Sequence, residues 1–218
     1  MSNHNTSFLR VVLPNAGWLS ISLIIQRAST ILLLPIMTRY LTPADYGIIA
    51  ALTILSTSVS IFANWGFGMG LMRNYFEYAP QQRKELLFTL LVAVCGTSCV
   101  LFGGAALVFT YTADWLIADW QPEYTLFLYL QFFSEVLIYP DRVIGVYLLV
   151  VQRVQAYTVR KSVIYICAMV VQVTLLVVFG LGVMAVFLAS IFGATLTLIA
   201  GLWLVRHDIA ARFRLNLL

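Results

Sequence analysis

The sequence predicts an all-α fold: a polytopic membrane protein in which six transmembrane helices form one bundle, with both termini in the cytoplasm. Composition is the first reason, because 61% of the 218 residues are hydrophobic and only 10% are charged, whereas soluble domains carry about 25% charged residues. This many apolar side chains cannot all be buried in one small core, so lipid must solvate part of the surface. The apolar residues also form long continuous runs, which argues against the shorter alternating strands of a barrel.

Six apolar segments are each long enough to cross a bilayer, which takes about 20 helical residues. Together they predict a single transmembrane lobe over residues 1–218. The helices are expected at about 13–37, 43–66, 86–110, 123–151, 162–180 and 182–205.

The first three segments differ in their boundary signals. The first has a charge at its centre, which is treated below. The second has a clear start, with Thr42 as N-cap, Pro43 at the first helical position and Asp45 three residues after the cap. The third contains no charged residue between Glu85 and Asp114. All three are therefore predicted as membrane-spanning helices.

The last three segments carry internal features. Pro140 interrupts the fourth segment and is expected to kink it and to free a backbone carbonyl. The fifth and sixth are uninterrupted. Small residues recur at every fourth position of the sixth segment and predict a smooth strip for close helix packing: Ala185, Ala189, Gly193, Thr197 and Gly201.

Two further faces are predicted in the same way. A weaker small-residue strip in the third segment consists of Cys95, Cys99 and Gly103. A polar seam in the second segment consists of Thr53, Ser56 or Thr57, Ser60 and Asn64. The seam is expected to face other helices or a water-filled cavity, because hydroxyl and amide groups are poorly solvated by lipid.

Topology follows from the basic residues. The connections on one side hold ten of them: Arg10, Arg73, Arg83, Lys84, Arg153, Arg160, Lys161, Arg206, Arg212 and Arg214. The opposite side holds only Arg39, together with the acidic residues Asp45, Asp114, Asp119 and Glu123. Because cytoplasmic loops are enriched in Lys and Arg, both termini are predicted to be cytoplasmic.

Arg27 and the charges of the fourth segment are the candidate functional residues. A charge at the bilayer centre costs roughly 2.5–3.5 kcal/mol on insertion scales, and such residues usually mark pathways. Gln131, Glu135 and Arg142 share one face of the fourth helix, and Glu135 lies roughly 18 Å below the outer end of that helix. Asp141 points elsewhere and is free to neutralise another basic group.

Three interpretations of these charges remain open. In the structural one, Arg27 pairs with Glu135 or Asp141 and only fixes how the first and fourth helices dock. In the functional one, Arg27 and Arg142 line a hydrated cavity that attracts an anionic group, while Glu135 balances them or titrates. In the third, Arg142 snorkels to the cytoplasmic interface.

Other chemistry is not indicated. The three cysteines, Cys95, Cys99 and Cys167, lie in apolar runs without a nearby histidine and are interpreted as packing residues, so no metal and no cofactor is expected. The run Gly66-Phe67-Gly68-Met69-Gly70 is a weak match to a phosphate loop and is interpreted as a flexible helix end. Arg153, Arg160 and Lys161 are interpreted as positive-inside anchors, with lipid head groups as an alternative ligand. The positive charge is spread over connections, so no nucleic-acid partner is expected.

Three motifs occur in an order that resembles a known family. The first is Pro35-Ile36-Met37-Thr38-Arg39-Tyr40-Leu41-Thr42-Pro43-Ala44-Asp45-Tyr46-Gly47; the second is the Gly-rich end of the second helix followed by Arg73; the third is Gln152-Arg153-Val154-Gln155-Ala156-Tyr157. Over essentially its whole length, the chain resembles the Wzx-type polysaccharide and O-antigen flippases of the multidrug/oligosaccharidyl-lipid/polysaccharide exporter superfamily.

The resemblance implies a substrate and a missing partner. The implied activity is the flipping of a polyprenyl-diphosphate-linked oligosaccharide across the inner (cytoplasmic) membrane, with membrane lipids around the protein, no bond made or broken, and thus no enzyme activity. Members of that family have two helical lobes facing a central cavity, and this chain corresponds to the first. It is therefore expected to be a truncated or split member, to pair with another copy of itself or a second lobe, or to be inactive alone; truncation is favoured.

Three alternatives are kept. One is a small-solute or drug exporter of the same superfamily, and the others are a membrane enzyme or a non-transporting scaffold in glycan assembly. Coupling to protons or sodium is a hypothesis that rests on Glu135 and Asp141.

Overall fold

The computed structural model describes residues 3–63, 66–116 and 120–209, and the side chains of 15–63, 66–112 and 120–209. Within these ranges every regular element is an α-helix. The helices are α1 (Asn3–Tyr40), α2 (Pro43–Ala63), α3 (Phe67–Asn74), α4 (Pro80–Leu116), α5 (Pro122–Val150), α6 (Val154–Val177) and α7 (Val183–Val205). Six of them are long and α3 is short, so the predicted all-α fold is confirmed.

The helix boundaries agree with the sequence in some places and not in others. α2, α5 and α7 lie close to the predicted segments, and α5 continues through Pro140 as one helix. The second segment was predicted to run to residue 66, but α2 ends at Ala63. Gly66 has a φ of 74°, a left-handed conformation that suits glycine, and it is the N-cap residue of the separate helix α3. Residues 67–70 of the glycine-rich run are thus helical and not merely a flexible end.

The fifth segment was predicted to begin at residue 162, but α6 begins at Val154. Arg160 and Lys161 therefore lie inside a helix and not in a connection. The sequence prediction was wrong here because charged residues lower the local hydropathy, although tertiary partners can keep them in a helix.

Within the part of the chain that the structure describes, five helices are long and apolar enough to cross a membrane: Asn15–Tyr40 of α1, α2, Pro80–Thr112 of α4, α6 and α7. The chain is therefore a multi-pass membrane protein. The remaining long helix, α5, is less apolar because it carries Glu135, Asp141 and Arg142. It is nevertheless the most enclosed helix, with Leu128, Ile144 and Leu148 fully buried.

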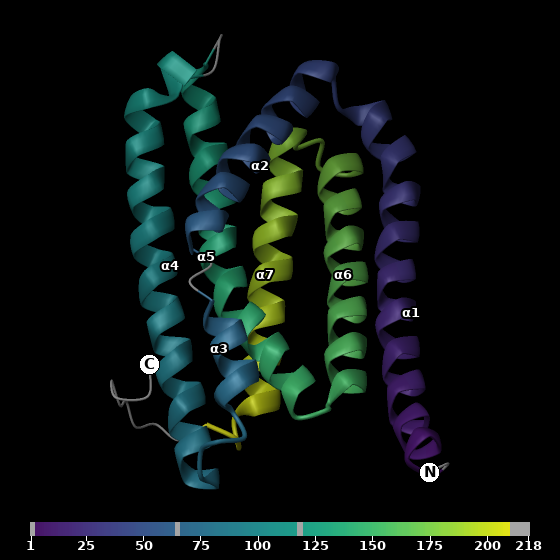
Figure 1. Ribbon diagram of the computed structural model, residues 1–218. Coiled ribbons are helices and arrows are strands. Elements are labelled where there is room, and N and C mark those ends of the chain that lie inside the picture. Colours follow the sequence, from purple (N-terminus) through teal and green to yellow (C-terminus); the bar gives the residue numbers. More distant parts are fainter. Residues whose placement is uncertain (1–2, 64–65, 117–119, 210–218) are drawn as a thin grey trace.

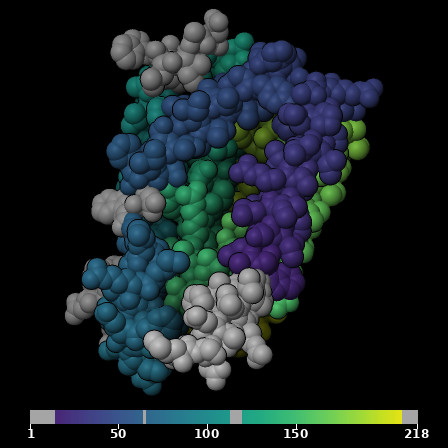
Figure 2. Space-filling view, turned by 45° about the vertical axis from the view of Figure 1, so that its right-hand side comes forward, coloured from purple at the N-terminus to yellow at the C-terminus, as the bar shows by residue number. Residues whose placement is uncertain are grey.

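The helices form a bundle around α5 (Figure 1). Helix α5 packs against α2, α3, α4, α6 and α7, while α7 also packs against α6. Helix α1 makes its main contact with α6 alone, so it stands at the edge of the bundle. The space-filling view shows a hollow between α1 on one side and α2 and α3 on the other, with α5 as its floor (Figure 2).

One end of the bundle collects the basic connections. The N-terminal end of α1, the start of α4, the turn between α5 and α6 and the end of α7 all lie there (Figure 1). Lys84 donates from Nζ to the carbonyl oxygen of His207 at 2.8 Å, and Arg153 pairs with Asp208 at 3.1 Å. This grouping agrees with the charge asymmetry of the sequence; that this end is cytoplasmic stays a prediction.

Several residues of the sequence argument lie outside the described side chains or residues: Arg10, Asn64, Asp114, Asp119, Arg212 and Arg214.

The turn between α1 and α2 has the predicted cap. Asp45 Oδ2 accepts hydrogen bonds from the backbone N–H and the hydroxyl of Thr42, both at 2.8 Å, and the backbone N–H of Asp45 donates to Thr42 Oγ1 at 3.3 Å. This reciprocal arrangement is a capping box with Asp at the third position.

The small-residue strip of α7 is also confirmed, because Ala185, Ala189 and Gly201 are buried and a Cβ at Gly193 would lie 3.1 Å from Ala168 Cβ of α6. The weaker strip predicted in the third segment is wrong as a packing face. Cys95, Cys99 and Gly103 are exposed, and nothing lies within 4 Å of a Cβ at Gly103.

Candidate functional site: a polar groove between α5, α6 and α7

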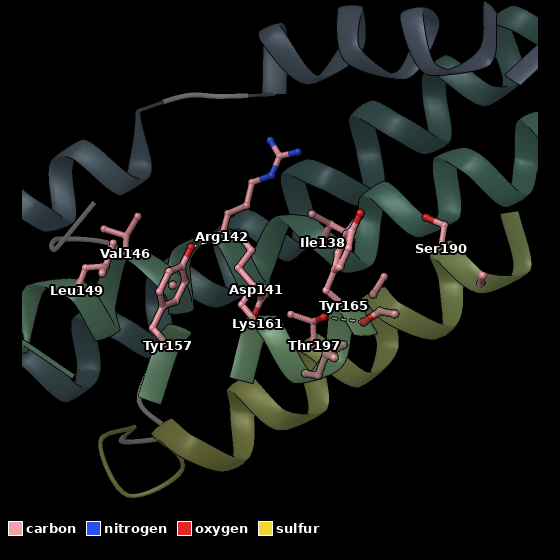
Figure 3. A pocket seen from close by; sticks show the side chains of 15 residues that line it. Ile138, Asp141, Arg142, Val146, Leu149, Tyr157, Lys161, Tyr165, Ser190 and Thr197 are labelled. Carbon is pink, nitrogen blue, oxygen red and sulfur yellow. Dashed lines mark hydrogen bonds between the residues drawn. The ribbon is translucent and has the colours of Figure 1, made fainter. Parts of the chain in front are cut away.

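A groove of about 530 Å³ lies between α5, α6 and α7. Its polar lining residues are Asp141, Arg142, Tyr157, Lys161, Tyr165, Ser190 and Thr197 (Figure 3). The two margins of the groove are tied to neighbouring helices. Tyr165 shares a hydrogen bond of 3.0 Å with Thr30 of α1, and Arg142 donates to Ser60 of α2 at 3.4 Å. A groove of this size could hold a diphosphate or a sugar unit.

Arg142 is held loosely. Its Nη2 lies 3.4 Å from Glu135 Oε2, and its guanidinium carbon is 4.4 Å from the centre of the Tyr139 ring. The side chain is 51% exposed, and Figure 3 shows it extending from α5 toward α2 and α3. Long contacts to an exposed guanidinium contribute little stability. Arg142 can therefore exchange these partners for a ligand anion.

The polar face of α5 meets part of the polar seam of α2, which was expected to face other helices or a water-filled cavity. Gln131 Nε2 donates to Ser56 Oγ at 3.0 Å, and the Tyr139 hydroxyl donates to the carbonyl oxygen of Ser60 at 2.6 Å. The remaining described members of the seam, Thr53 and Thr57, are exposed and donate to carbonyls of their own helix. Gln131, Glu135 and Arg142 thus lie on one side of α5, directed at α2.

Asp141 points away from α2, toward Arg160 of α6. Its Oδ1 is 2.7 Å from Arg160 Nη1, and the Arg160 side chain is only 3% exposed. Arg160 Nη1 also donates to the Thr197 carbonyl oxygen of α7 at 3.2 Å. The interpretation of Arg160 as a positive-inside anchor was therefore wrong, because the residue is buried between three helices.

Lys161 is the second cation of the groove. Its Nζ donates to the Tyr157 hydroxyl at 3.1 Å and lies 5.4 Å from the centre of that ring. Because Asp141 is paired with Arg160 and Glu135 with Arg142, the charge of Lys161 leaves the groove with excess positive charge. Two cations beside phenol and hydroxyl groups suit an anion that also carries hydroxyls, such as a phosphorylated sugar.

Arg27 is not brought to this cluster. Its side chain is exposed on α1, and it forms no ion pair with any described residue. Glu135 pairs with Arg142 and Asp141 with Arg160, so the pairing of Arg27 with either carboxylate is not observed. The link between α1 and α6 is made by hydroxyls instead: Ser162 donates to Ser22 at 3.1 Å.

The sequence argument missed Lys161, Tyr157 and Tyr165. A signal was present, because these residues are spaced by four along α6 and so share one face. It went unused because the helix was expected to start only at residue 162.

Fold and groove together define a multi-pass helical membrane protein with a cationic, hydroxyl-lined groove inside its bundle. A family model described as "polysaccharide biosynthesis protein" matches residues 36–218, so the chain belongs to this family. The match agrees with the resemblance to polysaccharide flippases. No curated protein and no solved structure matched the chain.

Proposed function

We propose that the chain takes part in flipping a polyprenyl-diphosphate-linked oligosaccharide from the cytoplasmic to the outer leaflet of the cytoplasmic membrane, as a transporter and not as an enzyme. The observation that carries the proposal is the groove lined by Arg142 and Lys161, in a member of a polysaccharide biosynthesis family. A diphosphate is the part of such a substrate that lipid excludes most strongly. An Arg fork and a Lys ammonium would replace the water that it loses.

The groove also fits the sugar part of the substrate. Tyr157 and Tyr165 present phenol groups along α6, and Ser190 adds a hydroxyl from α7. Such groups can hydrogen-bond to sugar hydroxyls, while phenol rings can stack on the faces of a sugar ring. The cations of the groove would therefore bind the charged diphosphate, and its phenol and hydroxyl groups would orient the sugar.

A second helical lobe completes the proposed transport site. Alternating access requires the site to be closed in turn from each side of the membrane. The hollow beside α5 is open in this chain, and α1 exposes large apolar residues such as Ile24, Ile31 and Leu32. We propose that a partner lobe, in another chain or in a second copy of this one, faces this hollow and that the two lobes rock about the bound headgroup.

Restoration of surface polysaccharide in a flippase-deficient strain tests the proposal. The chain is expressed with and without a matching second lobe. The Arg142→Gln and Lys161→Gln variants are compared with Arg206→Gln, which removes an exposed cation that stacks on Trp203 outside the groove. Each groove variant is expected to lower polysaccharide about tenfold or more, because a hydrogen bond to a charged group contributes roughly 1.5–3 kcal/mol. Arg206→Gln is expected to stay near the parent.

The same strain separates the other functions. If both groove variants restored polysaccharide as well as the parent at equal membrane levels, the groove would not be the substrate site. A drug or small-solute exporter would change resistance to added compounds without restoring polysaccharide.

Ion coupling, which we assign to Glu135 or Asp141, predicts that transport in vesicles responds to an imposed proton or sodium gradient. A rate independent of both gradients would contradict the coupling and leave the flipping proposal standing.

A further inference from the structure

Three consecutive residues of α6 face three different surroundings. Arg160 turns inward to Asp141 of α5, Lys161 lines the groove, and Ser162 contacts Ser22 of α1. Successive residues of an α-helix are rotated by about 100° from each other. One rotational position of α6 therefore decides at once which side chain enters the groove and which side chain holds α1.

The buried ion pair is poorly explained as a source of stability. Only Nη1 of Arg160 is engaged; Nε and Nη2 are buried and have no hydrogen-bond partner among the described residues. Removing two charges from water is costly, and incomplete hydrogen bonding does not compensate for it. A pair of this kind can instead favour one arrangement of helices over others, as buried polar residues do in coiled coils.

The surroundings of the Asp141–Arg160 pair favour Arg160 over Lys161 as the partner of Asp141. A Cβ at Gly201 of α7 would collide with Arg160 Nη1 and lie 3.0 Å from Asp141 Oδ1, so the glycine provides the space that the guanidinium occupies. A competing cation is one residue away, because Lys161 lines the same groove as Asp141. If α6 rotated by one residue, Lys161 would replace Arg160 as the partner of Asp141, and its charge would no longer be available in the groove.

We propose that the Asp141–Arg160 pair, seated against Gly201, sets the rotational position of α6, which makes Arg160 a positioning residue. It directs Lys161 into the groove and Ser162 toward α1. The role of Lys161 in binding a substrate rests on the proposed function. The positioning of α6 by the ion pair is independent of that function.

Disulfide cross-linking between α1 and α6 tests the rotational position. The native cysteines Cys95, Cys99 and Cys167 are first replaced by Ala. Ser22→Cys is then combined either with Ser162→Cys or with Lys161→Cys. The Ser22 and Ser162 hydroxyls are 3.1 Å apart, which is close to the spacing that a disulfide needs, whereas Lys161 faces the groove. The Ser162→Cys pair is expected to cross-link about tenfold faster, which corresponds to a preference of ~1.4 kcal/mol for the observed position.

Removing both charges then isolates their role. Asp141→Leu combined with Arg160→Met leaves no stranded charge and so avoids the main cause of misfolding. The cross-linking ratio is expected to fall about tenfold in this variant, toward equal rates. The matched control, Arg153→Gln combined with Asp208→Asn, removes the exposed pair near the start of α6 and is expected to keep the parental ratio.

Two outcomes would overturn the proposal. Equal cross-linking in the parent would mean that α6 has no fixed position, and an unchanged ratio in Asp141→Leu/Arg160→Met would mean that apolar packing alone sets it. If that variant is not recovered from the membrane, Asp141→Asn with Arg160→Gln carries the same comparison. The cross-linking result is independent of transport. Failure of Lys161→Gln to impair polysaccharide export would contradict the proposed function alone.

Discussion

Gly201→Ala is the smallest change that disturbs the junction of α5, α6 and α7. The added methyl group would collide with Arg160 Nη1 and would lie 3.0 Å from Asp141 Oδ1 and 3.2 Å from Ile144 Cδ1. Replacing Gly by Ala inside a helix normally stabilises it by about 1 kcal/mol. Here that gain is opposed, because the guanidinium must move away from its carboxylate.

The magnitude follows from these two effects. Removing one partner of a buried ion pair costs roughly 3–5 kcal/mol. This is the upper limit here, because the colliding atom is the end of a flexible arginine side chain that can shift. After the helix-propensity gain is subtracted, the net loss is at most about 2–4 kcal/mol. By the scaling of soluble domains of this size, in which 1 kcal/mol shifts the midpoint by roughly 2–4 °C, the melting temperature should fall by about 5–15 °C.

Thermal unfolding in one detergent, followed by the loss of the monodisperse peak, measures this shift. Gly104→Ala in α4 is the matched control, because nothing lies within 4 Å of a Cβ there, and it is expected to melt at or slightly above the parent. Adding Gly201→Ala to Asp141→Leu/Arg160→Met should cost less than adding it to the parent, because the colliding guanidinium is gone. A melting temperature of Gly201→Ala equal to that of the parent would refute this reasoning.

Three further predictions concern single side chains. If Arg27 attracts the anionic substrate, as the sequence indicated, Arg27→Ala should insert normally but abolish transport, as measured by surface polysaccharide at equal membrane levels. Normal transport would show that the cations of the groove suffice and that the exposed charge on α1 is dispensable. Tyr139→Phe removes the hydrogen bond to the Ser60 carbonyl but keeps the ring beneath Arg142, so it should lower the free energy of unfolding by about 1 kcal/mol in a thermal shift and leave most transport intact. Asp45→Ala removes the acceptor of both hydrogen bonds from Thr42 and should lower the free energy of unfolding by about 1 kcal/mol in the same thermal-shift assay. A smaller effect than that of Tyr139→Phe would indicate that water replaces the cap.

Local features of the fold could be predicted from the sequence. The capping box at Thr42 and Asp45 depends on residues three positions apart, and the strip of small residues in α7 depends on a spacing of four. The predicted helix boundaries were less accurate where a polar, charged segment is nevertheless helical. Residues up to Lys161 were expected to form a connection, yet they form the first two turns of α6, where α5 and α7 supply partners for the Arg160 side chain.

The pairing of charges could not be predicted. Asp141 was considered as a partner of Arg27 or of another, unnamed basic group, and the actual partner, Arg160, was grouped with the residues of a cytoplasmic connection. Which of two adjacent cations turns inward depends on the rotation of α6, and hydropathy does not record helix rotation. Arg27 illustrates the same limit, since its position near the bilayer centre gave no information about the direction of its side chain.

The central place of α5 follows from its charges. A helix with Glu135, Asp141 and Arg142 would be costly to expose to lipid on any face. At the centre of the bundle, Glu135 and Arg142 face α2 while Asp141 faces α6 and α7. The same arrangement gives the two neighbouring residues 141 and 142 different roles: the carboxylate is neutralised by a buried arginine, and the guanidinium is left loosely held and half exposed. The groove beside this helix therefore stays cationic because Asp141, which lines it, is neutralised by Arg160 of α6. For this reason, loss of Arg160 should affect the charge of the groove as well as the packing of α6.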